Sequence, residues 1–117
     1  AMKLILALIV AVSLTACGNK NPDEKVSTKI KGWKDGGFGL VALVNFAIDN
    51  QTSAPIKDVE VRCGGYSESG SRIDENNRTI YKVVQPGQKI RLNEFNMGFI
   101  HSQVQRMACR TVDYKTV

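Results

Sequence analysis

Residues 38–49 divide into two faces at a period of two, one of them entirely apolar, and this pattern is the strongest structural signal in the chain. One face carries Phe38, Leu40, Ala42, Val44, Phe46 and Ile48, and the other carries Val41, Leu43, Asn45, Ala47 and Asp49. A period of two predicts a β-strand. Because the second face also begins with apolar residues, we expect this strand to be central in its sheet.

Further stretches repeat this pattern with turn residues between them. The predicted strands are KDVEVRC (57–63), TIYKVV (79–84), KIRLNEF (89–95) and residues 104–114, and the predicted turns are NQTSAP (50–55), SESGS (67–71) and QPGQ (85–88). In the last turn proline presets φ and glycine supplies a positive φ. Five strands joined by turns, without a long amphipathic helix, predict an all-β fold, an antiparallel β-sandwich.

The N-terminus has a different pattern. Met2 and Lys3 precede an unbroken apolar run, residues 4–12. The small residues Thr15 and Ala16 then stand directly before Cys17. A run of this length is too short for a membrane-spanning helix, which needs about 20 residues. The pattern is typical of an export signal. Ala1 precedes Met2, which we interpret as the initiator, and we set Ala1 aside as a remnant.

The residues Leu14-Thr15-Ala16-Cys17 resemble the lipobox of bacterial lipoproteins. In that family the cysteine is diacylated on sulfur, the signal is cut just before it, and the new amino group is often acylated. The resemblance implies a signal peptide at residues 1–16 and anchoring of Cys17 in lipid by palmitate-like chains, which hold firmly at about 0.8 kcal/mol per buried methylene. The alternatives are an ordinary secretory signal with an incidental cysteine and a short apolar anchor.

The lipobox resemblance also bears on location. Gly18 follows the cysteine, where lipoproteins that stay in the inner membrane often have aspartate. The resemblance therefore implies a bacterial outer-membrane lipoprotein with its domain in the periplasm or at the cell surface.

The stretch between Cys17 and the first predicted strand is polar and glycine-rich. GNKNPDEKVSTKIK (18–31) lacks a sustained apolar period, although a short helix over residues 23–29 is an option, and GWKDGGFG (32–39) holds four glycines. Such composition is typical of a flexible linker. We therefore predict a lipidated tether over residues 17–37 and one folded domain over residues 38–117.

Three stretches in order, NFAIDN (45–50), KDVEVRCGGYSESG (57–70) and VVQPGQKIRL (83–92), resemble the FxLYD-type immunoglobulin-like domains of bacterial surface and periplasmic proteins. In that family a V-x-V-x-x-x-Y-x-x-x-G stretch is followed by a P-G turn and a strand. The match covers about residues 38–114 and implies an immunoglobulin-like β-sandwich. Because the matching residues are core and turn residues, it implies no active site.

Composition adds limits to this picture. The 117 residues, 43% of them hydrophobic, are enough for one small domain. The formal net charge of +5 favours acidic partners or anionic surfaces. The chain lacks the clustered Lys and Arg of a nucleic-acid-binding arm, so we expect no nucleic-acid partner.

The chain has three cysteines, so one is left over if two of them pair. With Cys17 assigned to lipid, Cys63 and Cys109 remain, each on the inward face of its predicted strand. In an exported protein such a pair favours a disulfide, which would stabilise the fold by about 4 kcal/mol on the chain-entropy estimate. Two buried reduced thiols are the alternative.

Signals for enzymatic chemistry are weak. His101 is the only histidine, which leaves no multi-histidine metal site. The acids Asp74-Glu75 and Asp58/Glu60 fit exposed turn and strand positions, and Gly36-Gly37-x-Gly39 precedes a strand, whereas a phosphate-binding loop precedes a helix. We therefore predict a protein that is not an enzyme and that needs neither metal nor cofactor.

Two surfaces are candidates for binding. Arg62, Arg106 and Arg110 fall on the strand faces opposite the cysteines, and Lys89 and Arg91 could extend that surface. Arginine binds carboxylates and phosphates in a bidentate manner, so this face would suit an acidic protein patch, a lipopolysaccharide phosphate or a peptidoglycan carboxylate; a plain solvated face is the alternative. Phe95, Met97 and Phe99 could form an apolar docking loop or close the end of the sandwich.

Together these features predict an envelope lipoprotein that binds lipid through Cys17 and an unidentified envelope protein through its domain. It would serve as a binding or assembly module, for example as an accessory to a secretion or conjugation machine or as an exclusion or immunity factor. Inhibition of a periplasmic hydrolase is the alternative, and an enzyme with Cys63 or Cys109 as nucleophile is a third hypothesis.

Overall fold

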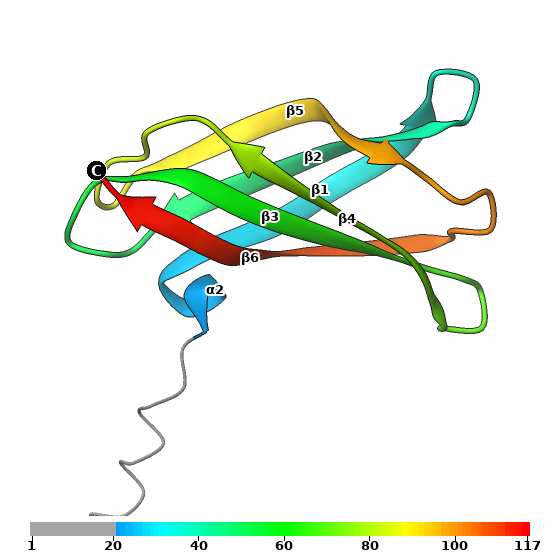
Figure 1. Ribbon diagram of the computed structural model, residues 1–117, viewed down its shortest axis with the longest axis horizontal. Helices are drawn as coiled ribbons and strands as arrows, with labels where there is room; N and C mark the ends of the chain where they lie inside the picture. The colour runs from blue at the N-terminus through cyan, green and yellow to red at the C-terminus, as the bar shows by residue number, and fades with distance from the viewer. Residues whose placement is uncertain (1–20) are drawn as a thin grey trace, which may run out of the picture.

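The computed structural model describes residues 21–117, which form one short helix and six long strands (Figure 1). The elements are α2 (Pro22–Lys25), β1 (Val26–Gly36), β2 (Val41–Asn50), β3 (Ile56–Tyr66), β4 (Arg72–Ile80), β5 (Lys89–Phe99) and β6 (Arg106–Thr116). They build two antiparallel three-stranded sheets, in the orders β1-β2-β5 and β4-β3-β6. This confirms the predicted all-β sandwich. The predicted signal peptide and Cys17 lie outside the described residues.

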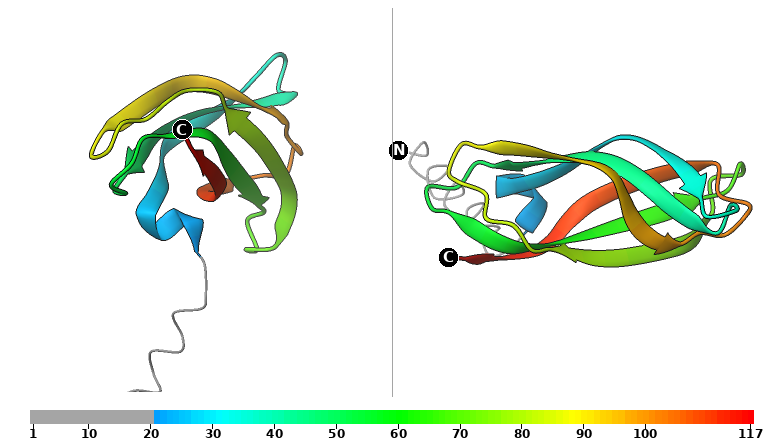
Figure 2. Two further views of the ribbon diagram at one scale, coloured as in Figure 1. Left: turned by 60° about the vertical axis from the view of Figure 1, so that its left-hand side comes forward. Right: turned by 90° about the horizontal axis from the view of Figure 1, so that it is seen from above.

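The strand order matches part of the immunoglobulin arrangement. Taken in chain order, β1-β2-β5 corresponds to strands A, B and E, and β4-β3-β6 corresponds to C′, C and F. The described residues hold no counterpart of the final strand G. Figure 2 shows the two sheets facing each other, with α2 at one side of the space between them.

The folded domain begins earlier than predicted. The expected tether over residues 17–37 includes β1, which pairs with β2 from Val26↔Asn50 to Gly36↔Val41. Its inward positions Val26 and Thr28 are buried, while its lysines face outward. The prediction was wrong here because a threonine and several lysines hide the period of two in an otherwise amphipathic strand.

The ends of two other predicted strands also differ. Phe38 and Leu40 do not belong to the inward face of β2 but lie exposed in the turn before it, where glycines at 37 and 39 adopt positive φ. The strand predicted over residues 79–84 ends at Ile80, and the polar run 72–80 forms β4 instead. β4 is an edge strand that pairs only with β3, so it needs few apolar residues.

The core fills the space between the two sheets. Its fully buried large side chains include Phe46, Ile48, Ile56 and Met97. Phe46 also packs edge-to-face against Phe95, with ring centroids 5.7 Å apart. The predicted core face of β2 is therefore confirmed from Ala42 to Ile48.

A carboxylate on α2 joins the facing edges of the two sheets. The backbone N–H groups of Thr28 on β1 and Thr111 on β6 both donate to Asp23 Oδ1, at 3.0 and 2.9 Å. The hydroxyls of Thr28 and Thr111 share a buried hydrogen bond of 2.7 Å. No strand ladder joins β1 to β6 within residues 21–117, so these contacts close the sandwich at this edge.

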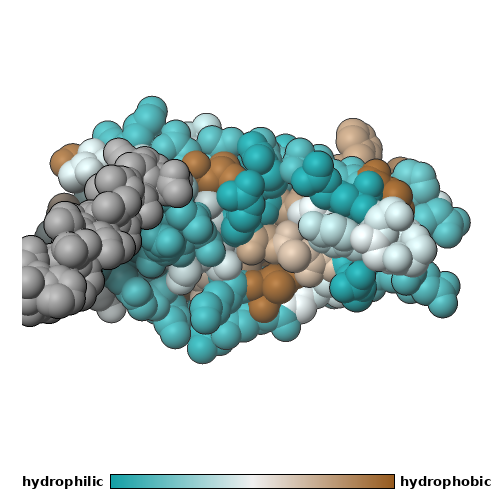
Figure 3. All heavy atoms as spheres, turned by 90° about the horizontal axis from the view of Figure 1, so that it is seen from below, coloured by the Kyte–Doolittle hydropathy of each residue, from teal (hydrophilic) through white to brown (hydrophobic). Residues whose placement is uncertain are grey.

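We call this edge the β1–β6 seam. Figure 3, which views the molecule from below, shows an apolar strip bordered by hydrophilic residues along this side. Ile30, Met107 and Cys109 are half-buried apolar residues of the two edge strands. The seam therefore leaves apolar side chains partly exposed between the two edge strands.

Candidate functional site

The predicted cysteine pair is confirmed as a disulfide. Cys63 on β3 and Cys109 on β6 lie directly opposite each other, with their Cα atoms 4.0 Å apart. The bond joins neighbouring strands of one sheet, and both sulfurs are used in it, so neither is a free nucleophile. Because a slip of one residue would turn every side chain to the other face, the bond also fixes which residues meet on the outer face.

The outer face of sheet β4-β3-β6 carries a cluster of arginines. Arg62 on β3 lies directly opposite Arg110 on β6, and Tyr66 lies opposite Arg106. The Arg106 guanidinium stands 5.9 Å from the centre of the Tyr66 ring, within reach of a cation–π contact. Arg72 lies opposite Tyr66 on the other side, on β4. We call Arg62, Arg72, Arg106 and Arg110 the arginine end of this face.

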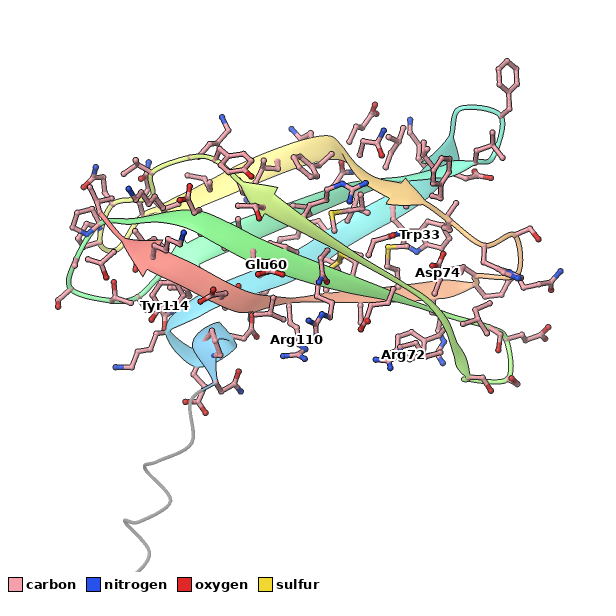
Figure 4. All side chains as sticks on the ribbon, viewed as in Figure 1. Trp33, Glu60, Arg72, Asp74, Arg110 and Tyr114 are labelled. Carbon is pink, nitrogen blue, oxygen red and sulfur yellow. A yellow bond between two sulfur atoms is a disulfide. The ribbon has the colours of Figure 1, made fainter. Side chains whose placement is uncertain are left out.

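The structure thus places the predicted Arg62, Arg106 and Arg110 on one sheet face and brings Arg72 beside them. Arg72 could not be selected from the sequence, because the stretch around it was interpreted as a turn and a polar run. Figure 4 shows both Arg72, on β4, and Arg110, on β6, on the lower side of the view.

The arginine end surrounds a shallow hollow of about 110 Å³. Its lining consists of Arg62, Gly64, Tyr66, Arg72, Glu75, Ala108, Cys109 and Arg110. A Cβ atom at Gly64 would lie 3.4 Å from Arg72 Cδ and 3.5 Å from the Tyr66 hydroxyl. The glycine is buried and lies close to Arg72 and Tyr66 in the lining of the hollow.

Only some of these arginines have a partner within the protein. Arg72 donates to Glu75 Oε2 at 3.3 Å, and Arg62 Nε lies 3.8 Å from the same oxygen and donates to Asn77 Oδ1 at 3.0 Å. Within residues 21–117 no carboxylate lies within 4.0 Å of the Arg106 or Arg110 guanidinium. Two guanidinium groups therefore remain available for a carboxylate or phosphate of a binding partner.

Lys89 and Arg91 do not extend the arginine end. They lie on β5, where Lys89 faces Asp49 and Arg91 faces Ala47, so they project from the other sheet. Alternation of side chains showed correctly that they point outward, but it could not show from which sheet.

The predicted docking loop is also wrong, because Phe95, Met97 and Phe99 belong to strand β5. Met97 is fully buried and Phe95 contacts the core. The strand continues past residue 95 through irregularities in its pairing with β2. Only Phe99 is exposed.

Phe99 instead belongs to an exposed apolar group that the sequence did not predict. It pairs with Val41, and the neighbouring Ile100 N–H donates to Leu40 O at 2.9 Å, which brings the end of β5 to the β1–β2 turn. We call Phe38, Leu40 and Phe99 the apolar tip. Phe38 is fully exposed at a φ of 64°, a conformation that is costly for a bulky side chain. The glycines on either side of Phe38 were the sequence signal that could have predicted a turn at this position.

Other chemistry has little support in this part of the chain. Residues 21–117 contain no group of three or more His, Cys, Asp or Glu side chains placed to hold a metal ion. Over the same residues, no helix has the length and apolar character needed to cross a bilayer. The only histidine, His101, is exposed, and its backbone N–H donates to Asp74 Oδ2.

Comparison with protein-family models, curated proteins and solved structures found no match to this chain. What the arginine end can do therefore follows from its own chemistry.

Proposed function

We propose that this chain is a lipid-anchored protein of the bacterial envelope, and that its β-sandwich is a protein-binding module that docks through the arginine end. The single observation that carries the docking role is the direct pairing of Arg62 with Arg110 beside a hollow. Like charges opposite each other on neighbouring strands are destabilising. The pair therefore does not stabilise the fold, whereas its two positive charges would attract an acidic partner.

The envelope location is supported by two features. The lipobox-like residues 14–17 would supply the anchor. The Cys63–Cys109 disulfide fits a compartment that is oxidising, such as the bacterial periplasm. An immunoglobulin-like domain on a lipid anchor suits a role in assembling or regulating a larger envelope complex.

A site-specific crosslinker tests the docking role. A photoreactive amino acid at Ala108, in the hollow, should give a defined crosslinked product in intact cells, and Arg106→Glu with Arg110→Glu should abolish it. The same probe at Asn93, an exposed position on β5, should give no such product. A product at both positions, or a product at Ala108 that survives the double substitution, would contradict the proposal.

The anchor is tested separately by labelling cells with radioactive palmitate. Label should enter the wild-type chain and be lost in Cys17→Ser. Because the strands of the sandwich span Val26–Thr116, the substituted chain should still fold with the Cys63–Cys109 disulfide intact. Persistent label would contradict lipidation at Cys17.

Inhibition of a periplasmic hydrolase is a second candidate, and the apolar tip favours it. A projecting turn with a fully exposed Phe38 has a shape that could enter an active-site cleft. If so, the purified protein should slow peptidoglycan hydrolysis by a periplasmic extract, and Phe38→Ser should remove the effect while the arginine substitutions leave it unchanged.

A further inference from the structure

The face that carries the arginine end also carries a separate group of acids. Asp58 and Glu60 on β3 and Asp113 on β6 border a second hollow of about 200 Å³, together with Thr79, Tyr81 and Lys115. We call Asp58, Glu60 and Asp113 the acidic end. In Figure 4, Glu60 lies further along the sheet than Arg72 and Arg110, toward Tyr114.

The two ends meet at consecutive outward positions of the same strand pair. Arg62 lies opposite Arg110, and Glu60 lies opposite Asp113. Exchanging the charges within one strand would have given two favourable pairs of opposite charge. Instead the sheet holds two adjacent pairs of like charge, each of which is unfavourable on its own.

Within residues 21–117, Glu75 partly compensates Arg62, but no ion pair joins one end of this arrangement to the other. The ion pairs among residues 21–117 are Lys34–Glu94, Arg62–Glu75 and Arg72–Glu75, and none of them joins the arginine end to the acidic end. Separated charges of this kind are satisfied best by a surface that presents the opposite charges in the reverse order.

We propose that the partner of this face is a second copy of this chain, in a face-to-face dimer that places the arginine end of each copy on the acidic end of the other. The proposal rests on the docking role given to this face above. A two-fold axis that lies in the interface, across the strands and between Arg62 and Glu60, produces this match. Every contact then occurs twice, as in any isologous interface.

The region near this axis suits close contact. Val112 lies between Arg110 and Asp113 on β6, at the irregularity where Glu60 pairs with Asp113 and Val61 pairs with Thr111. It is half-buried and is not among the residues that pack on the core. Two copies of Val112 would meet near the axis and provide an apolar centre between the charged ends.

A partner with only an acidic patch fits less well. It would satisfy the arginine end but would set its own acids against Asp58, Glu60 and Asp113 wherever it covered the whole face. A second copy satisfies both ends at once, because the face is its own electrostatic complement after a half-turn.

The dimer also agrees with anchoring in one membrane. The axis runs across the strands, which is the vertical direction of Figure 1, and α2 lies below the sheets in that view. Rotation about this axis keeps α2 of both copies on the same side. The N-terminal ends of the two domains can therefore approach a single bilayer.

The size of the face sets the expected affinity. Three strands about 4.8 Å apart and up to 11 residues long cover roughly 500 Å² in each copy. A standard stable interface covers about 800 Å² on each partner. We therefore expect a weak dimer that depends strongly on ionic strength, since its contacts are exposed ion pairs.

A charge exchange between the two ends provides the test. One variant carries Arg62→Glu and Arg110→Glu, and the other carries Glu60→Lys and Asp113→Lys. Each full-length chain is solubilised in a non-ionic detergent, and its association is measured by sedimentation velocity at low salt. Far-UV circular dichroism and thiol titration first establish that each variant is folded with its disulfide closed.

The wild type should dimerise reversibly, and 0.5 M NaCl should weaken the dimer at least tenfold. Each variant alone should also associate at least tenfold more weakly than the wild type. An equimolar mixture should regain wild-type association, because both pairs of facing ends are again opposite in charge. Lys89→Glu with Arg91→Glu, on the outer face of the other sheet, makes the same charge change as the first variant and should not alter the dimer.

The proposal is overturned if the folded variants fail to associate when mixed, or if either alone dimerises like the wild type. A wild type that stays monomeric also overturns it. If the dimer is overturned, the crosslink at Ala108 shows whether the docking role fails as well. A product that contains a different protein would leave the docking role standing without the dimer, and a product that contains only this chain would support both.

Discussion

At the scale of single residues, the closure of the sandwich depends on one carboxylate. Asp23 accepts hydrogen bonds from the backbone N–H groups of Thr28 and Thr111, which belong to different sheets. Asn21 in turn accepts from the Asp23 N–H and caps the short helix that holds the aspartate. This side chain therefore links the short helix and β1, which lie in a segment whose composition is typical of a flexible linker, to β6 of the other sheet.

Asp23→Ala should destabilise the domain by about 2–4 kcal/mol, because it leaves two partly buried backbone donors without an acceptor. Asp23→Asn should cost less, since its side-chain oxygen can still accept. The measurement is the free energy of unfolding in urea, with Glu24→Ala as the matched control on an exposed neighbour. Equal losses for Asp23→Ala and Glu24→Ala would show that the contact does not hold the seam closed.

At the scale of strands, the sequence predicted the faces better than the partners. Period-two alternation placed β2, β3, β5 and most of β6, and it correctly put Arg62 and Arg110 opposite the cysteines. It missed β1, whose buried Thr28 and outward lysines look like a polar linker. It also treated Phe38 as a core residue, because a fully exposed phenylalanine in a glycine turn obeys the same alternation.

What the sequence could not provide is the register between strands. The pairing of Glu60 with Asp113 depends on an irregularity in the β3–β6 ladder at residues 60–61, which shifts it by one residue from the register that joins Cys63 to Cys109 and Arg62 to Arg110. Alternation also states whether a side chain points in or out, but not which sheet carries it, so Lys89 and Arg91 were assigned to the wrong face.

The disulfide makes the β3–β6 pairing a covalent feature, and its loss should be measurable. Cys63→Ala with Cys109→Ala should lower the free energy of unfolding by about 4 kcal/mol, because the open chain gains entropy when a closed loop spanning a sequence separation of 46 is released. Urea unfolding with and without reductant should give the same loss in the wild type and none in the variant. A loss below about 1 kcal/mol would mean that the strands hold their register without the bond.

At the scale of the whole molecule, the length of chain between Cys17 and the domain would limit how the proposed lipid-anchored form sits on a membrane. Five residue steps separate Cys17 from Pro22 at the start of α2. Five steps reach at most roughly 17 Å. If Cys17 is acylated, α2 and the β1–β6 seam must stay close to the lipid, and Figure 1 shows β5 on the opposite side of the sheets from α2.

The orientation follows from this limit and can be measured on vesicles. A fluorophore attached at Lys25, beside the seam, should be quenched strongly by lipids that carry a quencher in the headgroup, whereas one at Asn93 on β5 should be quenched weakly. Inserting about 20 flexible Gly and Ser residues after Gly18 should reduce the difference, because the domain could then turn freely. Equal quenching at both positions in the native-length chain would show that the short connection does not orient the domain. Strong quenching at Lys25 together with weak quenching at Asn93 would place the α2 side of the sandwich toward the bilayer, which is the side that both copies of the proposed dimer share.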